Sequence, residues 1–555
     1  MKNDAVNHKK TKRYLVCFIV IWAVQMAAAF YFCTQKAGFH EDEYYTYYST
    51  ARTAGFYVED GEWMENEAYR NEFVVLPGQQ FQYGLVRTVQ SWDVHPPVYY
   101  WIFHTVASLV PGVFSKWIGL GINLFIHGIN LILLTYLSYL AGGRNEKLAL
   151  GVTMFYGLTP AAISGVVFIR MYELLTMFVL LCAILHMRAV CRLQEEKSKD
   201  RYVIPEKIGS LSFVNFLLPL MVITYLGFLT QYYYFIFLFY MAVGFGMYLF
   251  WRDRNLWNCL RYGASQMAAF VLAYLTYPSC LGQMFRGQRG AQATENFFDL
   301  SNTMMRFRFF LDLLDEYVFG KLLAAFLLVV IGLFLLLYFR RSSGKSSVQD
   351  RAVPWWPLGI LCFAVAGYFL TVSKTALLLG DTSNRYQLPV YGMIVLLLFG
   401  AIYSMWERCV PRKSWSVYPA VAVAVICLVI DFAGLMSNKV VFLYPEDREQ
   451  VAFAARQAQA GTPVIYLYNE GADWCIWDVA NELMEYEEVY FARTGREGQL
   501  TDKTIAGASA LVVYLADGAD VQVEIDRIFA GNQNLTDCEL QYEEKYCDVY
   551  YLYGE

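Results

Sequence analysis

The sequence predicts a polytopic α-helical membrane protein of about eleven transmembrane helices, followed by a C-terminal extracytoplasmic α/β domain. The 555 residues are 57% hydrophobic with a mean hydropathy of +0.33, which is more apolar than a soluble protein of this size. Several runs approach the roughly 20 apolar residues that span a bilayer. The charge is also uneven, and this unevenness indicates two environments.

From Glu446 onward there are 22 Asp and Glu against 7 Lys and Arg, a net charge of −15. Because the whole chain carries −5, the rest carries +10. A basic part and an acidic part favour two domains. We therefore predict a transmembrane domain over residues 1–439 and a small extracytoplasmic α/β domain over residues 440–555.

The first apolar run, about 14–33, follows the basic stretch Lys9-Lys10-Thr11-Lys12-Arg13. A cleaved signal peptide is the alternative, but the run is long and no clear small-x-small cleavage site follows it. We favour an uncleaved helix with a cytoplasmic N-terminus, as its basic flank indicates. The predicted crossings are 14–33, 116–140, 147–163, 166–187, 211–230, 232–250, 258–280, 321–340, 354–373, 386–406 and 416–437.

Basic loops test this count, because cytoplasmic loops are enriched in Lys and Arg. With eleven crossings, five basic loops fall on the side of the N-terminus, and the acidic tail lies outside. The segment 98–110 is too short to cross, so we predict a helix in the outer interface. The five loops are Arg144 with Lys147, Arg188 to Lys207, Arg252 to Arg254, Arg340 to Arg351, and Arg408 to Lys413.

Three long stretches then lie outside: a first loop over 34–115, a second over 281–320, and the tail. In the tail we expect strands at 463–468 and 510–515, helices at about 446–460, 473–486 and 519–531, and a closing pair of strands near 538–543 and 546–553. Cys538 and Cys547 flank that pair, so a disulfide is one option. The other ten cysteines are scattered and show no ligand spacing.

Acidic residues follow the first helix in the run Glu41-Asp42-Glu43. Three adjacent carboxylates repel, so at least one needs a cationic partner or a raised pKa. A carboxylate here suits a general base that deprotonates an acceptor hydroxyl or amine. The alternative is an ordinary solvated acidic loop.

A second polar patch is Asp93-Val94-His95-Pro96-Pro97. The two prolines stiffen the chain, which suits the placing of Asp93 and His95 at a site. A plain helix start is the alternative.

Arginines stand at two outer helix ends, Arg170 with Tyr172 and Arg385 with Tyr386. An arginine at a membrane boundary is costly unless it meets an anion, and its planar fork of donors binds phosphate well. Lys374 precedes the second pair. Snorkelling side chains or interfacial anchors are the alternatives.

These residues resemble the membrane glycosyltransferases of the GT-C fold that use polyprenyl-phosphate sugars. The resemblance is to the branch of protein O-mannosyltransferases and lipid A aminoarabinose transferases. The matching motifs are Asp42-Glu43, Asp93-x-His95-Pro96-Pro97, Arg170-x-Tyr172 and Arg385-Tyr386-x-x-Pro389. They span about residues 40–390, and the first two together are the most specific.

The resemblance implies an inverting transfer from a polyprenyl-phosphate-linked sugar to a cell-envelope glycan, lipid or protein. Asp42 would act as the base, with Glu43, Asp93 and His95 in the same catalytic group. The departing lipid phosphate would meet Arg170 and Arg385, and loop 281–320 would cover the lipid, with Arg286 and Arg289 as further candidates. No cofactor or metal site is predicted, although Asp42, Asp93 and His95 are types that can hold a divalent cation.

The chain departs from the family where Val98-Tyr99-Tyr100 replaces the usual Leu after the prolines, and where no β-trefoil insert interrupts an outer loop. Two other classes stay open. A lipid or glycan transporter predicts ionisable residues at mid-membrane depth and inverted repeats. A membrane sensor predicts that the tail does the work and that Asp42 is dispensable. We expect a multi-pass plasma-membrane protein, and nothing indicates nucleic acid.

Overall fold

The computed structural model describes residues 2–51, 58–199, 211–342, 355–409, 417–496, 500 and 502–554. The chain divides into two compact units, each described here by itself. The first unit consists of Met1–Thr34, Gln90–Tyr99 and Gly119–Val441, and the second of Gln35–Val89, Tyr100–Ile118 and Phe442–Glu555. The prediction had assigned all of loop 34–115 to the membrane domain, whereas the structure groups most of it with the C-terminal residues.

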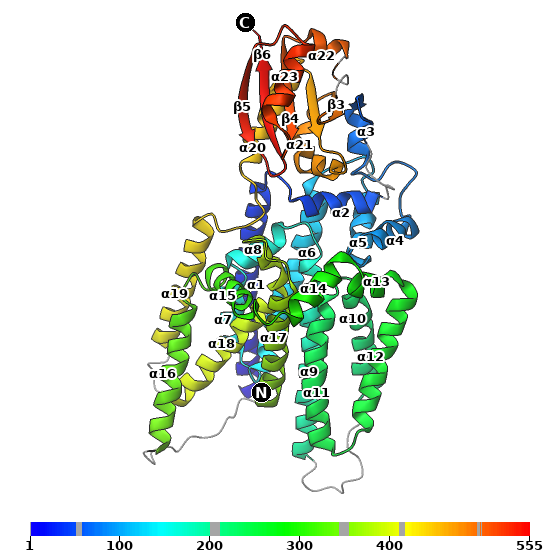
Figure 1. Ribbon diagram of the computed structural model, residues 1–555. Helices are drawn as coiled ribbons and strands as arrows, with labels where there is room; N and C mark the ends of the chain where they lie inside the picture. The colour runs from blue at the N-terminus through cyan, green and yellow to red at the C-terminus, as the bar shows by residue number, and fades with distance from the viewer. Residues whose placement is uncertain are drawn as a thin grey trace. The chain divides into compact units, whose positions relative to one another are not determined.

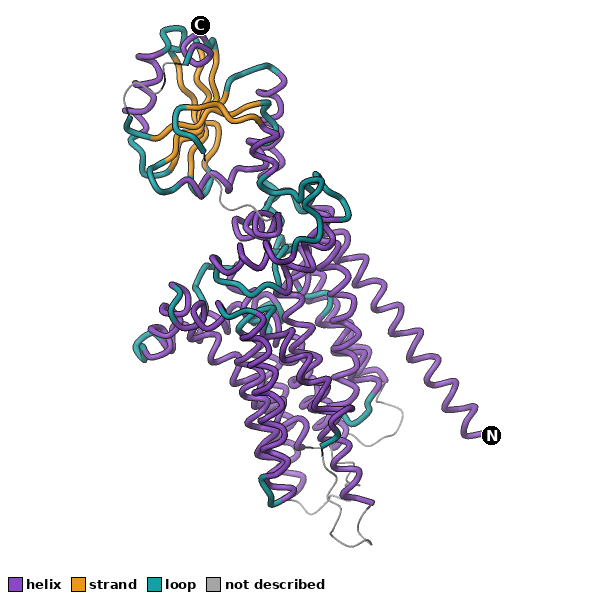
Figure 2. Tube along the Cα trace, turned by 90° about the vertical axis from the view of Figure 1, so that its right-hand side faces the viewer, coloured by secondary structure: helices purple, strands orange, loops and turns teal. Residues whose placement is uncertain are grey.

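The first unit is a bundle of helices (Figure 1, Figure 2). Each of the eleven predicted crossings overlaps at least one helix of the described residues, although two of them contain a break. The helices at the predicted crossings are α1 (Lys2–Gln35), α6 (Lys116–Ala141), α7 (Glu146–Tyr156), α8 (Pro160–Val167), α9 (Tyr172–Lys199), α10 (Leu218–Phe228), α11 (Tyr233–Asp253), α12 (Trp257–Thr276), α16 (Leu323–Ser342), α17 (Trp355–Thr375), α18 (Leu388–Cys409) and α19 (Val417–Met436).

Six helices of the described residues are long and apolar enough to cross a membrane, and a seventh span results if α7 and α8 count as one. The segments Phe213–Phe228, Leu323–Phe339 and Val425–Met436 are apolar but shorter. The protein is thus a polytopic helical membrane protein, and the count of eleven stays a prediction. The basic stretches at 200–207, 343–351 and 410–413 lie outside the described residues.

Two breaks interrupt the predicted helices 147–163 and 166–187. The first lies between α7 and α8, whose axes differ by 63°. It follows from Thr159, whose hydroxyl accepts from the Ala162 amide at 3.2 Å, and from Pro160 at the first helical position. The second break covers residues 168–171, so the predicted helical start at 166 was wrong. Helix α9 begins only at Tyr172.

Close packing inside the bundle is visible where α11 meets α17. A Cβ added to Gly367 would lie 2.3 Å from the ring of Tyr240. Only a glycine admits the tyrosine ring at this distance, so α11 and α17 pack closely at this point.

Three shorter helices, α13 (Ser279–Phe285), α14 (Gln288–Phe298) and α15 (Thr303–Tyr317), form the predicted second outer loop. Helices α14 and α15 pack against α17. The segment predicted to lie in the interface is helix α5 (Val98–Ser108), which follows α4 (Tyr83–Trp92).

The second unit contains a six-stranded mixed sheet with the order β1-β3-β2-β4-β6-β5. Strand β2 is parallel to β3 and β4, and the outer pairs are antiparallel. Both predicted single strands and the closing pair exist, but β3 and β1 were missed. The strands are β1 (Glu62–Glu65), β2 (Val464–Tyr468), β3 (Glu488–Arg493), β4 (Ala510–Ala516), β5 (Asp537–Glu543) and β6 (Cys547–Tyr553).

Strand β2 is buried along its whole length. Parallel strands are normally buried on both faces because helices cover them. One face packs a core that includes Ile465, Val513 and Leu552. The helices of this unit include α2 (Glu41–Ala51), α3 (Asn66–Asn71), α20 (Asp447–Gln459), α21 (Ala480–Leu483), α22 (Lys503–Gly507) and α23 (Val521–Gly531).

The possible disulfide is absent. Cys538 lies opposite Leu552 in the β5–β6 ladder, whereas Cys547 begins β6 beside the turn. The two residues therefore sit at opposite ends of the hairpin, and both are free thiols. The spacing in sequence gave the hairpin correctly but not the register that separates the sulfurs.

Candidate active site

The break at residues 168–171 carries Arg170. Val167 ends α8, and Phe168 has an extended backbone at φ −87° and ψ 109°. The Arg170 amide then donates to the Phe168 carbonyl at 2.7 Å. This short turn leads Arg170 out of helical geometry in a buried position, with only 2% of the residue exposed. A buried cation of this kind needs polar neighbours.

The polar neighbour of Arg170 is His95. Its ring nitrogens Nδ1 and Nε2 lie 3.2 and 3.3 Å from Arg170 Nη2. His95 Nδ1 also lies 3.2 Å from Asp93 Oδ2. His95 therefore lies within hydrogen-bond distance of both the Asp93 carboxylate and the Arg170 guanidinium. The predicted patches at 93–97 and 170–172 therefore meet.

Electrostatics link the same three side chains. Burial raises the pKa of Asp93, but the charge and hydrogen bond of His95 and the charge of Arg170 outweigh that effect, so the pKa lies below the ordinary value. Asp93 therefore stays ionised at neutral pH. It can orient His95 and offset the charge of Arg170.

Gln283 of α13 supports this segment and was not found in the sequence. Its Nε2 donates to the carbonyls of Gln90 at 3.0 Å and Asp93 at 2.6 Å. Tyr232 donates to its Oε1. A lone glutamine in a polar loop gave no signal for this role, which depends on contacts across about 190 residues of sequence.

Arg385 approaches the same break from a 3₁₀ turn, Thr382–Tyr386. It is 3% exposed, and its guanidinium lies 5.2 Å from the centre of the Phe168 ring and 5.1 Å from that of Tyr386. Such stacking on aromatic faces suits arginine. Phe168 thus lies against one predicted arginine and two residues before the other.

Tyrosines surround Arg385. The rings of Tyr172 and Tyr233 each lie 5.9 Å from the ring of Tyr386, and Tyr172 stacks on Phe168 at 5.9 Å. The structure therefore brings together six of the predicted site residues: Asp93, His95, Arg170, Tyr172, Arg385 and Tyr386.

Lys374 makes its own set of contacts. Its Nζ donates to the Asp299 carbonyl at 2.6 Å, Asn302 Oδ1 at 2.7 Å and Thr303 Oγ1 at 2.9 Å. These bonds fix the link between α14 and α15 to the end of α17. Arg286 and Arg289 are exposed, at the end of α13 and the start of α14.

Asp42 and Glu43 belong to the second unit, at the start of α2. Glu43 is fully buried and pairs with Lys36 Nζ at 2.9 Å. It also accepts from the His40 amide at 2.6 Å, which is the reciprocal bond of a helix capping box. Asp42 is 27% exposed, with the His40 ring 3.6 Å away.

The neighbouring Glu41 contacts Lys545 Nζ at 2.7 Å. Two of the three adjacent carboxylates therefore have cationic partners, as their mutual repulsion predicted. Over the part of the chain that the structure describes, no cluster of three or more His, Cys, Asp or Glu is arranged to hold a metal ion.

No protein-family model matches the chain, and no curated protein matches its sequence. Among solved structures, the chain is similar to ArnT from Cupriavidus metallidurans bound to undecaprenyl phosphate, with a TM-score of 0.46, 13% identity and 98% of each chain covered. It is also similar to the Archaeoglobus fulgidus oligosaccharyltransferase, with a TM-score of 0.44, 10% identity, and 90% of this chain and 69% of that chain covered.

A further structure of the Archaeoglobus fulgidus enzyme AglB, in complex with an inhibitory peptide and a dolichol-phosphate, matches with a TM-score of 0.39 and 10% identity over 95% of this chain and 72% of that one.

Proposed function

We propose that this protein is an inverting glycosyltransferase of the plasma membrane that moves a sugar from a polyprenyl phosphate to an acceptor at the outer face. One observation carries the proposal: two buried arginines lie at the same helix break, Arg385 against the Phe168 ring and Arg170 two residues later beside the Asp93–His95 pair. Two fixed guanidinium groups next to oriented aromatic rings suit a phosphate that carries an apolar chain.

The reaction needs such a pair. The acceptor oxygen or nitrogen loses its proton and attacks the anomeric carbon, while the bond from that carbon to the phosphate oxygen breaks. The lipid phosphate leaves with the bonding electrons and gains negative charge. Arg170 and Arg385 stabilise that charge as it develops, and His95 holds Arg170 in place.

Asp42 is the residue that we propose as the base. Glu43 beside it is occupied by Lys36 and by the helix cap, whereas Asp42 retains solvent access. A carboxylate that accepts the proton of a hydroxyl or amine contributes about 10²–10⁴-fold to such a rate.

The test is transfer from labelled polyprenyl-phosphate sugars in membranes that contain wild type, Asp42→Asn, Arg385→Ala or Arg87→Ala. Arg87 is an exposed arginine on α4 and serves as the control. We expect release of lipid phosphate by wild type and Arg87→Ala, and a loss of at least about 100-fold in the other two.

Equal release by wild type and Asp42→Asn would move the base to another residue and keep the reaction class. Equal release by wild type and Arg385→Ala would contradict the phosphate role of the arginines. If folded wild type releases nothing from any donor of a broad panel, the glycosyltransferase proposal is wrong.

A further inference from the structure

A polar stripe runs along α6, inside the helical unit. Asn123, His127 and Asn130 are spaced by four and three residues and therefore share one face of the helix. They are 0, 2 and 5% exposed. Buried polar side chains in a membrane-spanning helix are costly unless they make specific bonds, so each one needs a reason.

Asn123 binds the end of α8. Its Nδ2 donates to the Val166 carbonyl at 3.2 Å and the Phe168 carbonyl at 2.6 Å. The last carbonyls of a helix lack partners within the helix, and the break after Val167 creates such carbonyls in a buried place. Asn123 satisfies them and so fixes the residues directly before Arg170.

Asn123 also reaches the other half of the site. Tyr99, two residues after Pro97, donates from its hydroxyl to Asn123 Oδ1 at 3.2 Å. One side chain therefore connects the segment that carries His95 with the segment that carries Arg170. The two segments are about 75 residues apart in the sequence.

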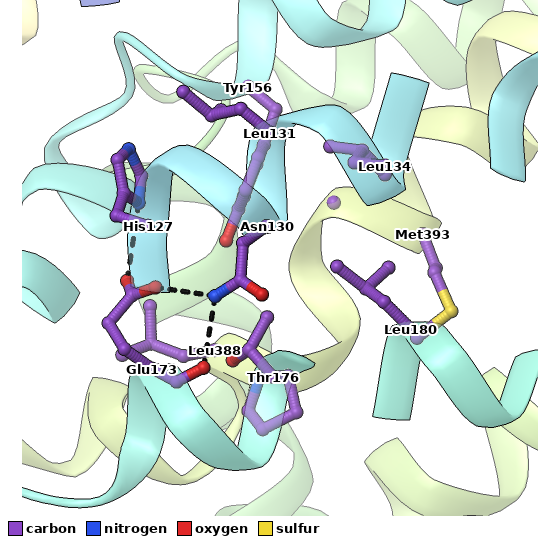
Figure 3. Close-up of a pocket in the computed structure, with 12 residues that line it drawn as sticks. His127, Asn130, Leu131, Leu134, Tyr156, Glu173, Thr176, Leu180, Leu388 and Met393 are labelled. Carbon is purple, nitrogen blue, oxygen red and sulfur yellow. Dashed lines mark hydrogen bonds and ion pairs between the residues drawn. The ribbon is translucent and has the colours of Figure 1, made fainter. Parts of the chain in front are cut away.

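Further along the same face, Asn130 and His127 hold Glu173 (Figure 3). Asn130 Nδ2 donates to the Glu173 carbonyl at 2.9 Å and to Oε2 at 2.7 Å. His127 Nδ1 lies 3.4 Å from Oε1. Glu173 is in the first turn of α9, three residues after Arg170, where a carboxylate is favoured by the helix dipole.

The surroundings leave Glu173 little freedom. His127, Asn130 and Glu173 line a cavity of only about 10 Å³, which is about the room that one water molecule needs. A Cβ at Gly165 would lie 2.8 Å from Glu173 Oε1, so α8 also packs closely against the carboxylate. Both ends of the break are thus clamped to α6.

We propose that Asn123, His127, Asn130 and Glu173 are positioning residues that clamp residues 166–173 to α6 and so hold Arg170 and Tyr172 against His95. They act through Arg170 and touch no substrate. This inference rests on the proposed function for its consequence, because Arg170 is there assigned to the lipid phosphate.

The experiment compares Asn123→Leu and Glu173→Gln with Thr135→Val in the full chain. Leu and Gln keep nearly the size of the original side chains. Thr135 is a matched control: it lies on α6, is 5% exposed, and bonds Thr153 of α7 at 2.6 Å without touching the break. Two quantities are measured, hydrogen exchange of the amides at 166–173 and the affinity for undecaprenyl phosphate.

We expect Asn123→Leu and Glu173→Gln to accelerate exchange at 166–173 and to weaken undecaprenyl phosphate binding by about tenfold each, since each loses at least one buried hydrogen bond. Thr135→Val changes neither quantity. In an Arg170→Ala background, Asn123→Leu weakens binding no further, because its effect passes through Arg170. A merely structural role predicts additive losses instead.

Unchanged exchange at 166–173 in Asn123→Leu would overturn the clamp, whatever the lipid affinity. Faster exchange with unchanged undecaprenyl phosphate affinity would overturn the link to Arg170. If wild type itself does not bind undecaprenyl phosphate, the proposed function fails, and the exchange result alone still decides whether the clamp exists.

Discussion

At the scale of single residues, the adjacent carboxylates of Asp42 and Glu43 at the start of α2 have different surroundings. Glu43 lies fully buried against Lys36, whereas Asp42 is partly exposed. A buried ion pair is part of the packed structure, and removal of one partner leaves the other charge buried without compensation. The sequence alone could not make this distinction, because Lys36 stands seven residues away in a segment with no regular periodicity.

We therefore predict opposite phenotypes for Glu43→Gln and Asp42→Asn. Glu43→Gln leaves Lys36 with a buried unpaired charge and should destabilise the second unit by about 3–5 kcal/mol, seen as a lower melting temperature. Asp42→Asn should leave the melting temperature within about 2 °C of wild type and abolish transfer. Calorimetry and the transfer assay, run on the same preparations, make the comparison. Full activity in Asp42→Asn with a wild-type melting profile contradicts it.

At the scale of elements, four carboxyls of the second unit interact, of which Glu482 is buried and the other three are half-buried. The pKa is raised to about 7 for Asp447, about 6 for Asp478, about 7 for Glu482 and about 8 for Glu544. Burial is the largest cause in each case, and neighbouring carboxylates contribute to the rise. They come from α20, from the turn and helix before β3, and from the turn between β5 and β6.

These raised values predict a stability that falls with rising pH. Each carboxyl binds its proton more tightly in the folded protein than at its unfolded pKa of about 4, so the stabilisation is complete below pH 4 and is lost as the pH rises through 6 to 8. We expect the melting temperature of the second unit to drop by a few degrees between pH 6 and 9. Calorimetry over that range measures it.

Glu544→Gln is the informative variant, because glutamine mimics the protonated carboxyl. In this variant the melting temperature should fall less between pH 6 and 9 than in wild type. Glu539→Gln, at an exposed position on β5, should show the same fall as wild type. A melting temperature that is flat or rises between pH 6 and 9 would show that the four carboxyls are ionised throughout.

The edge strand β1 shows how a distant loop completes a sheet. Residues 62–65 pair with β3, which lies more than 400 residues later, and Trp63 packs on Tyr490 with the ring centres 5.3 Å apart. We predict that Trp63→Ala accelerates hydrogen exchange in residues 488–493 about tenfold or more, as loss of a packed aromatic ring costs at least 1 kcal/mol here. The control is Trp474→Ala, at an exposed tryptophan. Equal exchange at residues 488–493 in both variants would contradict the claim that β1 stabilises the sheet.

Elements that are determined by a local sequence pattern were predicted, whereas those that depend on contacts between distant residues were missed. Apolar runs gave helix within each of the eleven predicted crossings but not their breaks, and alternating or continuous apolar stretches gave β2, β4 and the hairpin. The break at 168–171 was missed, because Phe168 and Ile169 continue the apolar pattern while the turn depends on Asn123 of another helix. Strand β1 was missed because its pairing is set by tertiary contacts.

The candidate site was predicted in the same uneven way. The motifs gave His95, Arg170 and Arg385, because charged groups beside apolar runs stand out. The residues that hold them, Gln283 and the α6 stripe, did not stand out. For the stripe there was a local signal, namely Asn, His and Asn at positions four and three apart within an apolar run, and this pattern is the one to search for.

At the scale of the whole molecule, the orientation of the chain in the membrane decides whether the proposed chemistry is possible. A polyprenyl-phosphate donor used at the outer face requires the outer ends of the helices to carry Arg170 and Arg385. If the N-terminus is cytoplasmic and the second unit is outside, the number of crossings is odd, as eleven is. Six complete spans among the described helices would leave both ends on one side, whereas the broken pair α7 and α8, counted as a seventh span, gives the odd number.

Labelling of two positions tests this orientation directly. Cys538 is an exposed free thiol on β5, and we predict that a membrane-impermeant maleimide reacts with it in intact cells and not in Cys538→Ser. Lys147→Cys, placed in the Cys538→Ser background at an exposed position in the first turn of α7, should react only after the membrane is opened, because its basic loop is predicted to be cytoplasmic. The reverse pattern would turn the arginine cluster towards the cytoplasm and exclude transfer at the outer face. Labelling of both positions from outside would mean an even number of crossings between them and would remove one of the shorter helices after Lys147 from the span count.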